Sequence, residues 1–213
     1  MVDDIFDTRF EGKDVEVGEN FLQPGDDFNL IKVDPSLRRV IIGVGWDVNA
    51  FNADTLDADV SLFLLNKEIM TREDGDFIFY NQPETQDGAV RHHGDSRTGA
   101  GDGDDETITV DLQTLSYDVV SIAIAVSVYK GYEKEQNLGM LRNAYVRIVN
   151  ADTDNELCRY KLDQVLDESL ASGAIVASLN REGPKWHLKC DTDFVSGGLG
   201  DLARRYGLII NQE

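Results

Sequence analysis

The residues with the clearest potential for chemistry form one run, from Gly94 to Glu106. It contains five acidic residues and four glycines with a single arginine, and its largest apolar residue is Ala100. Carboxylates packed this densely repel one another unless a cation or an arginine neutralises them. Calcium suits such a loop, because it takes roughly 6–8 oxygen ligands in a flexible shell, whereas magnesium prefers to keep its waters. The run therefore predicts a calcium site, and the alternative is a solvated acidic hairpin.

The run does not follow the EF-hand pattern. If that pattern starts at Asp102, Thr107 stands where glycine is needed and Gln113 stands where the closing glutamate belongs. A strand pattern has already begun by Ile108. Glycine instead provides the unusual φ values that let backbone carbonyls turn inward toward a cation.

Further oxygen ligands come from two predicted strands. If the segment from Asp57 to Leu65 is extended, Asp57 and Asp59 share one face at the beginning of the strand. Asn81 closes the next predicted strand, and an amide oxygen is a neutral ligand for a hard cation. Thirteen acidic and only four basic residues lie between Asp57 and Glu106, so negative charge is concentrated in this part of the chain.

Catalytic groups are harder to find beside these carboxylates. His92 and His93 are adjacent, so in a strand they point to opposite faces and at most one reaches the acidic cluster. Paired carboxylates can hold two metals for phosphate-ester hydrolysis, but no nucleophile with a neighbouring base is evident. We expect a protein that is not an enzyme, with a metal-dependent phosphohydrolase as an alternative.

The elements that position these residues are mostly strands. Period-two alternation and runs of β-branched residues predict strands over 28–33, 39–46, 57–65, 77–81, 89–93, 108–112, 119–129, 141–149, 156–162, 173–179 and 186–190. Near the C-terminus, Leu199, Leu202, Ala203 and Tyr206 follow helical spacing, and Gly207 offers a stop. The expected fold is all-β dominated, a two-sheet β-sandwich with short peripheral helices, including one near the C-terminus.

Length and composition indicate one large domain. The chain has 213 residues, little proline and no linker-like segment, so we expect an N-terminal extension over 1–26 and a single sandwich domain over 27–213. The formal net charge of −20 argues against binding to nucleic acid and against direct docking on anionic lipid. Peripheral association with a membrane is then expected only through calcium or a partner.

The expected compartment follows from targeting and membrane-span features of the sequence. The first residues lack the features of a signal peptide, and no apolar run has the length of a membrane span, so we expect a cytoplasmic protein. Cys158 and Cys190 are isolated, which favours reduced thiols over a disulfide or a zinc site. Trp46, Trp186 and the tyrosines are expected to lie in the core.

Together these motifs resemble the TerD family of tellurite-resistance and stress proteins, from about Asn29 to Ile210. The resemblance is carried by GVGWD at 43–47, LDAD at 56–59, FYN at 79–81, the acidic run, NLG at 137–139, RNA at 142–144, and the segment from Gly197 to Gly207. The chain departs from the family pattern in three places: Ala100 replaces a usual glutamate, Ser96-Arg97 replaces a usual Asn-Leu pair, and a longer N-terminal entry places PGDD at 24–27 near a usual Gly-Gly-Asn turn. The loss of one carboxylate at Ala100, with Arg97 nearby, favours one tight calcium site over two.

The resemblance implies a calcium-binding β-sandwich that acts in a stress or tellurite-resistance system, with one or two Ca²⁺ ions as cofactor. Calcium would order the acidic loops and create a surface for other proteins of a stress-resistance complex. A calcium-dependent module for anionic lipid is the other alternative. The metal-ligand candidates are Asp57, Asp59, Asn81, Asp95, Asp102, Gly103, Asp104, Asp105 and Glu106.

Overall fold

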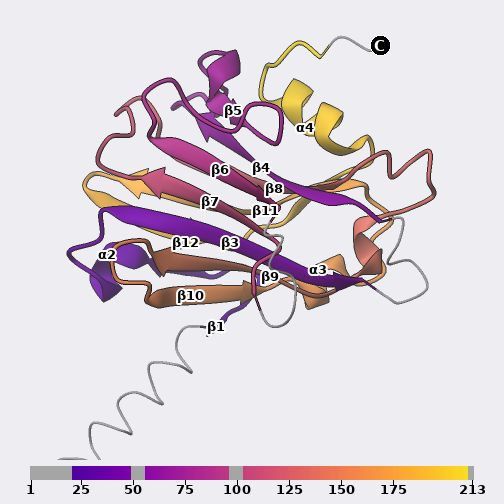
Figure 1. The fold of residues 1–213 in the computed structure, drawn as a ribbon, viewed down its shortest axis with the longest axis horizontal. Helices are drawn as coiled ribbons and strands as arrows, with labels where there is room; N and C mark the ends of the chain where they lie inside the picture. The colour runs from indigo at the N-terminus through magenta and orange to yellow at the C-terminus, as the bar shows by residue number, and fades with distance from the viewer. Residues whose placement is uncertain (1–20, 49–55, 96–102, 211–213) are drawn as a thin grey trace, which may run out of the picture.

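The computed structural model describes residues 21–48, 56–95 and 103–210, and these form two β-sheets packed face to face (Figure 1). Sheet A has the strand order β1 (Phe21–Leu22), β10 (Glu156–Lys161), β9 (Leu141–Asn150), β3 (Arg39–Val48), β7 (Glu106–Asp111) and β6 (Val90–Asp95). Sheet B has the order β2 (Asp27–Asn29), β12 (Lys185–Lys189), β11 (Gly173–Glu182), β8 (Ser121–Val128), β4 (Ala58–Leu65) and β5 (Phe77–Ile78), and β13 (Asp193–Val195) also pairs with β11. The predicted two-sheet sandwich is confirmed.

The helices are short and lie outside the two sheets. They are α2 (Leu30–Val33), α3 (Asp163–Leu166) and α4 (Gly198–Arg205), with single 3₁₀ turns at Asp74–Asp76 and Leu138–Met140. The predicted C-terminal helix is therefore present, and Gly207 follows it with a φ of 93°, as a left-handed C-terminal stop requires. Among the described residues, no helix is long and apolar enough to cross a membrane.

The core forms where the inner faces of the sheets meet. On β4, Val60, Leu62 and Leu64 point into this core, as the alternation predicts, and every residue of the central strand β8 is buried. Phe63 and Leu65 point the other way and pack in a second apolar cluster under α4. Sheet B is thus apolar on both faces along most of β4, while Asp59, near the start of the strand, is partly buried.

Two strand predictions need correction. The segment predicted as a strand over 28–33 turns into α2, because the side chain of Asn29 accepts a hydrogen bond from the backbone N–H of Lys32 and so caps a helical turn. The strand predicted over 77–81 ends at Ile78, since Phe79 and Gln82 exchange backbone hydrogen bonds across a tight turn. Asn81 therefore lies in a turn.

Strand β1 lies within the segment expected as an N-terminal extension, residues 1–26. Phe21 and Leu22 pair in parallel with Arg159 and Tyr160 at the edge of sheet A. The sandwich therefore includes the last residues of that segment.

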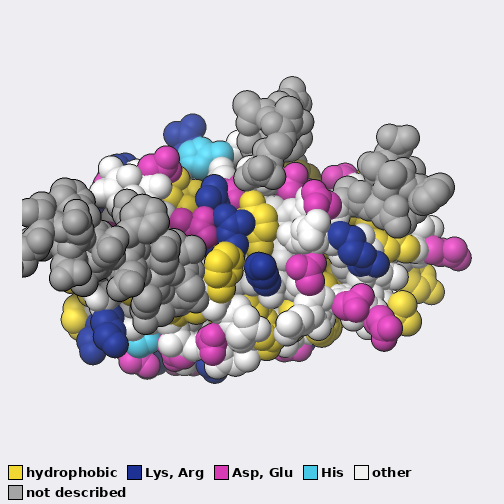
Figure 2. Space-filling view, turned by 90° about the horizontal axis from the view of Figure 1, so that it is seen from below, with side chains coloured by type: hydrophobic (Ala, Val, Ile, Leu, Met, Phe, Trp, Pro, Cys, Tyr) yellow, Lys and Arg dark blue, Asp and Glu magenta, His cyan; other side chains and the backbone are white. Residues whose placement is uncertain are grey.

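The surface of the protein carries side chains of both charges. On the face seen in Figure 2, acidic, basic and apolar side chains are interspersed, and charge of one sign does not dominate it.

Cys158 and Cys190 are free and buried, and burial raises the pKa of the Cys190 thiol to about 12. Both thiols are therefore protonated core residues.

Candidate functional site

Three of the predicted metal-ligand residues, Asp57, Asp59 and Glu106, lie near the starts of β4 and β7 and interact by charge. Glu106, the first residue of β7 in sheet A, is buried, and its Oε2 accepts a hydrogen bond of 2.7 Å from the backbone N–H of Val60 in sheet B. His92, also buried, places its Nε2 3.1 Å from the Val60 carbonyl oxygen and 3.3 Å from Glu106 Oε2. This contact joins the two sheets and brings Glu106, the last residue of the acidic run, near Asp59.

The hydrogen bond at Nδ1 determines which tautomer the His92 ring adopts. The backbone N–H of Gly94 donates a hydrogen bond of 2.8 Å to His92 Nδ1. The proton of the neutral ring must then sit on Nε2, where it is shared between the Val60 carbonyl and Glu106. Both nitrogens of His92 thus serve the structure, and neither is available as a general base.

Asp59 is the carboxylate with the least compensated charge in this cluster. It is partly buried, and burial, followed by the charges of Glu106 and Asp57, raises the pKa of Asp59 to about 6. Among the described side chains only His92 opposes this shift, and no lysine or arginine pairs with Asp59. A carboxylate in this position gains from a cation that removes the repulsion.

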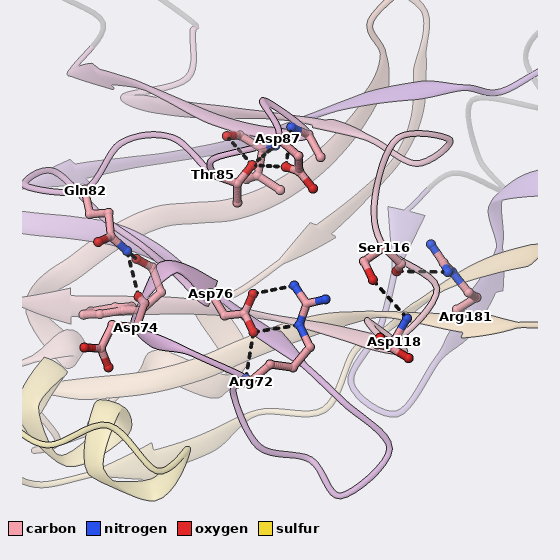
Figure 3. A network of polar contacts seen from close by, with 12 residues as sticks. Arg72, Asp74, Asp76, Gln82, Thr85, Asp87, Ser116, Asp118 and Arg181 are labelled. Atoms are coloured by element: carbon pink, nitrogen blue, oxygen red, sulfur yellow. Dashed lines mark hydrogen bonds and ion pairs between the residues drawn. The ribbon is translucent and has the colours of Figure 1, made fainter.

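Elsewhere the chain pairs its buried carboxylates with arginine. Asp76, which is 1% exposed, accepts hydrogen bonds from Arg72 Nε and Nη2 at 2.9 and 2.7 Å, and a third from the Arg72 backbone N–H (Figure 3). That pair closes the charged turn before β5. Asp59 differs from Asp76 because no such partner reaches it in the described part of the chain.

Asp104 has an arginine partner as well. Arg147 on β9 binds it through two hydrogen bonds, Nε to Oδ1 at 2.7 Å and Nη2 to Oδ2 at 2.9 Å, and only 5% of the Asp104 side chain is exposed. Tyr145 donates a third hydrogen bond, of 3.0 Å, to Oδ1. Burial and the Asp104 charge raise the pKa of Tyr145 to about 12, so its hydroxyl remains a donor at neutral pH.

The same network continues across the outer face of sheet A. Arg147 Nη1 also binds Glu156 Oε2 at 3.0 Å, and Arg159 binds Glu156 through two hydrogen bonds. The Arg159 guanidinium lies 4.2 Å from the centre of the Tyr145 ring. The charge of Asp104 is therefore neutralised by Arg147 of β9, far from it in sequence, and Glu156 and Arg159 of β10 extend the network.

Two glycines of β3 make room for this network. Gly43 faces Arg147 in the β3–β9 register and Gly45 faces Tyr145. A Cβ atom on Gly43 would lie 2.1 Å from Asp104 Oδ2, and one on Gly45 would lie 2.5 Å from the Tyr145 hydroxyl. The missing side chains create the space in which Asp104 reaches across β3.

Asp105 is held at the same strand end. Its backbone N–H donates to the Val44 carbonyl at 2.9 Å, and its Oδ2 accepts a hydrogen bond of 2.7 Å from the backbone N–H of Trp46. Asp104, Asp105 and Glu106 therefore all dock the end of the acidic run onto the sandwich.

The remaining predicted ligands are dispersed or lie outside the described part. Asn81 and Gly103 are exposed. The backbone of Asp95 ends β6, but its side chain lies outside the described residues, as does Asp102. Within the described residues no three acidic, histidine or cysteine side chains are close enough to form a metal site. Asp57, Asp59 and Glu106, named here the acidic cluster, interact by charge, because Asp57 and Glu106 both raise the pKa of Asp59.

Sequence reasoning did not identify Tyr145 and Arg147 as partners of the acidic run. In the motif at 142–144, Arg142 binds the carbonyls of Gly139 and Leu141, and Asn143 donates a hydrogen bond of 2.6 Å to Asp47. A signal was present: Gly43 and Gly45 leave one face of β3 bare, and Tyr145 and Arg147 alternate on a strand that can lie beside it.

Comparison with known proteins places the chain among stress and tellurium-resistance proteins. It is 38% identical to general stress protein 16U of Bacillus subtilis, over 88% of this chain and 96% of that protein. It is 39% identical to the uncharacterized protein YceE of Bacillus subtilis, over 88% of this chain and 97% of that protein. The tellurium resistance protein TerD of Serratia marcescens is 35% identical, over 88% and 96%.

A solved structure shares the fold. The crystal structure of a homologue of telluride resistance protein TerD from Streptomyces coelicolor superimposes with a TM-score of 0.61 at 18% identity, over 82% of this chain and all of that one. The model of the TerD domain matches residues 20–206. With this match and these relatives, the chain belongs to the TerD family of tellurium-resistance and stress-response proteins.

Proposed function

We propose that this protein is the calcium-binding module of a stress-response system, and that Asp57 and Asp59 supply carboxylate ligands at one end of the sandwich. The observation that carries the proposal is Asp59, a partly buried carboxylate beside two other acidic groups, for which the described residues supply no basic partner. A divalent cation with oxygen ligands would remove that repulsion.

The donor set fits calcium better than a transition metal. The candidate ligands offer oxygen atoms, and calcium accepts these in a flexible shell, whereas zinc favours cysteine and histidine. The one imidazole in contact with the cluster, His92, already uses both nitrogens. Because Asp104, Asp105 and Glu106 have protein partners, we assign them the role of docking the acidic run, and Asp95 and Asp102 remain predicted ligands.

We also propose that the role is not enzymatic. His92 is committed to Val60, Glu106 and Gly94, and both cysteine thiols are buried with raised pKa values. What calcium supplies is charge neutralisation at the start of β4 and order in the segments around it. We propose that such a surface recruits a protein partner in the cytoplasm. The family membership, with relatives named for general stress and tellurium resistance, supports only the stress-response part of the proposal.

Calorimetry tests the proposal directly. Calcium is titrated into the chelator-treated protein with and without magnesium, and the titration is repeated on Asp59→Asn. We expect a dissociation constant in the micromolar range or below, one or two ions per chain, weak competition by magnesium and a loss of at least about tenfold in affinity in the variant.

Asp118→Asn is the matched control, since it removes one exposed acidic group from another turn. Its calcium affinity should stay within about twofold of the parent protein, because distant exposed charges are screened. Absence of binding heat together with an unchanged melting temperature in calcium would refute a calcium function. Equal losses in the two variants would assign the effect to net charge alone.

A further inference from the structure

A cleft of about 470 Å³ opens on the outer face of sheet B, between the start of α4 and the loop that follows β8. Asp59 of β4 and Ser127 of β8 are partners in the register of these strands, and both line the cleft. The pairing continues beyond them, because the backbone N–H of Tyr129 donates to the Asp57 carbonyl at 2.7 Å, and Tyr129 also lines the cleft. An aspartate of the acidic cluster therefore lies beside an aromatic residue at this cleft.

Three tyrosines line this cleft, contrary to the expectation that the tyrosines lie in the core. Tyr80, Tyr129 and Tyr132 are 50%, 42% and 85% exposed. Burial raises the pKa of Tyr80, and the charge of Asp59 adds to the shift, so this ring and this carboxylate lie close together. The face of a tyrosine ring carries negative potential and attracts a cation within about 6 Å of the ring centre.

The chain's own lysines show this attraction. The ammonium groups of Lys130 and Lys134 each lie 5.3 Å from the centre of the Tyr129 ring, within the range of a cation–π contact. In the described part of the chain, no lysine or arginine lies in this way over Tyr80 or Tyr132. These two rings therefore remain for a cation from outside the chain.

Tyr80 is held in place by a series of aromatic contacts. Its ring meets Phe79 edge-on at 5.3 Å, Phe79 stacks on Phe77 at 4.4 Å, and Phe77 stacks on Phe63 at 4.6 Å. Phe63 is fully buried beneath α4. This wall of the cleft is therefore anchored before any ligand arrives, which lowers the entropy lost on binding.

The basic groups at the cleft leave no site for an anion. Arg204 lines the cleft, but its Nη2 already binds Asp201 Oδ1 at 2.6 Å. Oδ2 of Asp201 accepts a hydrogen bond of 2.8 Å from the backbone N–H of Gly197, so this carboxylate also takes a backbone donor at the start of α4. Lys130, the other basic residue of the lining, lies over the Tyr129 ring.

Acidic groups outweigh the basic groups that remain. Asp59 and Glu133 both line the cleft. Among the described residues no lysine or arginine pairs with Asp59, and Glu106 and Asp57 add their negative charges next to it. A cation at Asp59 would therefore be attracted by the three carboxylates of the acidic cluster.

We propose that this cleft binds an organic ammonium ion, with the charged nitrogen at Asp59 and its carbon substituents against the rings of Tyr80 and Tyr132. An uncharged ligand would leave the Asp59 charge uncompensated, and a bare metal ion would leave the rings unused. A small free cation and the lysine side chain of a partner share this chemistry. The proposal goes beyond calcium binding and does not depend on it, although both cations would use Asp59.

Two pairs of compounds test the proposal on the full chain, in chelator and about 0.15 M sodium chloride to screen exposed charges. Choline is compared with its uncharged isostere 3,3-dimethylbutan-1-ol, and Nα-acetyl-lysine methylamide with the norleucine analogue, by titration followed in amide NMR spectra. We expect at least one cation to bind with a dissociation constant below about 10 mM, and at least about fivefold more tightly than its uncharged analogue. The shifted amides should fall in 129–133 and 196–200. Which cation binds distinguishes a methylated small cation from a lysine side chain.

Three variants and two matched controls complete the test. Asp59→Asn and Tyr80→Ser should each weaken ammonium binding by at least about threefold. Tyr132→Ser should do the same, and its side chain is exposed enough that the substitution leaves the core intact. Asp118→Asn and Tyr117→Ser remove an exposed carboxylate and a tyrosine that is 91% exposed, both outside the cleft. The two controls should bind like the parent protein.

Three results would overturn the proposal. These are binding weaker than about 10 mM for both cations, equal affinity for each cation and its uncharged analogue, or equal losses in variants and controls. The calcium proposal is decided separately, because calcium binding is measured by its own heat and the ammonium titrations are run in chelator. Asp59→Asn should weaken the binding of both cations, whereas Tyr80→Ser should weaken only that of the ammonium ion.

Discussion

Asp104 and Arg147 form a two-bond ion pair across the backbone of Gly43, with N···O distances of 2.7 and 2.9 Å. The pair joins the last part of the acidic run, which leads into β7, to β9, and β3 lies between these two strands in sheet A. The end of the acidic run is therefore attached to the sheet, and this part of the run does not form a solvent-exposed or metal-binding loop.

Removal of Arg147 should destabilise the protein. Arg147→Met leaves the Asp104 carboxylate buried without its partner, and we expect the free energy of unfolding to fall by about 2–4 kcal/mol in urea titrations. Arg39→Met is the control, because the Arg39–Asp152 pair is half exposed and its removal should have a much smaller effect. Equal effects of the two substitutions would contradict the structural role of Arg147.

Gly43→Ala should act through Asp104. The new Cβ would clash with the carboxylate of Asp104, so we expect a loss of about 2 kcal/mol or more in the free energy of unfolding. In the Asp104→Ala background the clash is gone, and the same substitution should have a smaller effect. Gly75→Ala is the control, since a Cβ there meets nothing closer than 3.6 Å. Strict additivity in this double-mutant cycle would argue against the clash.

Asp59 should make the calcium-free protein less stable as pH rises. Its pKa is about 6 in the fold against about 3.9 in the unfolded chain, so the folded state binds more protons between these values. The Asp59 contribution therefore worsens as pH rises from about 4 to 6, and its full cost is present above that window. We expect Asp59→Asn to raise the free energy of unfolding by about 1–2 kcal/mol at pH 7.5 in chelator, and by almost nothing near pH 4.

Calcium should reverse the order of stability of the parent protein and Asp59→Asn. With saturating calcium the parent protein gains stability by mass action, whereas Asp59→Asn gains less. Thermal melts at pH 7.5, with chelator and with calcium, give the comparison. A variant that is less stable than the parent in chelator would show that the Asp59 charge is compensated within the fold.

His92 should be needed for the contact between the sheets. His92→Leu leaves the Gly94 N–H without its acceptor and removes the contacts to Val60 and Glu106, so we expect a loss of about 2–3 kcal/mol in the free energy of unfolding. His93→Leu changes the neighbouring exposed ring, whose Nε2 forms a hydrogen bond of 2.8 Å with the Thr109 hydroxyl, and should cost less than about 1 kcal/mol. A larger effect at position 93 would contradict this assignment.

Much of the fold was predictable from local pattern. The strand around Val60 follows from alternation, and α4 follows from apolar spacing that ends at Gly207. The exception at Asn29 has a local cause too, since its side chain caps a helical turn where alternation alone predicts a strand. Period-two and period-3.6 patterns report which face of an element is buried, and they need no knowledge of neighbouring elements.

The candidate site was predictable only in part. The sequence indicated that Asp57 and Asp59 share a face and that the acidic run carries unusual charge, and the structure brings Asp59 and Glu106 together. The sequence did not show which carboxylates would have protein partners. Arg147 reaches Asp104 only because β7, β3 and β9 are neighbours in that order.

The sequence by itself therefore determined the family, the two-sheet architecture and the concentration of acidic groups at one part of the chain. The tertiary structure decided which of those groups are neutralised: Arg147 pairs with Asp104, whereas no described basic residue pairs with Asp59. The reason is physical. Burial patterns depend on residues a few positions apart, whereas charge compensation depends on strand register, which places residues more than forty positions apart within hydrogen-bonding distance.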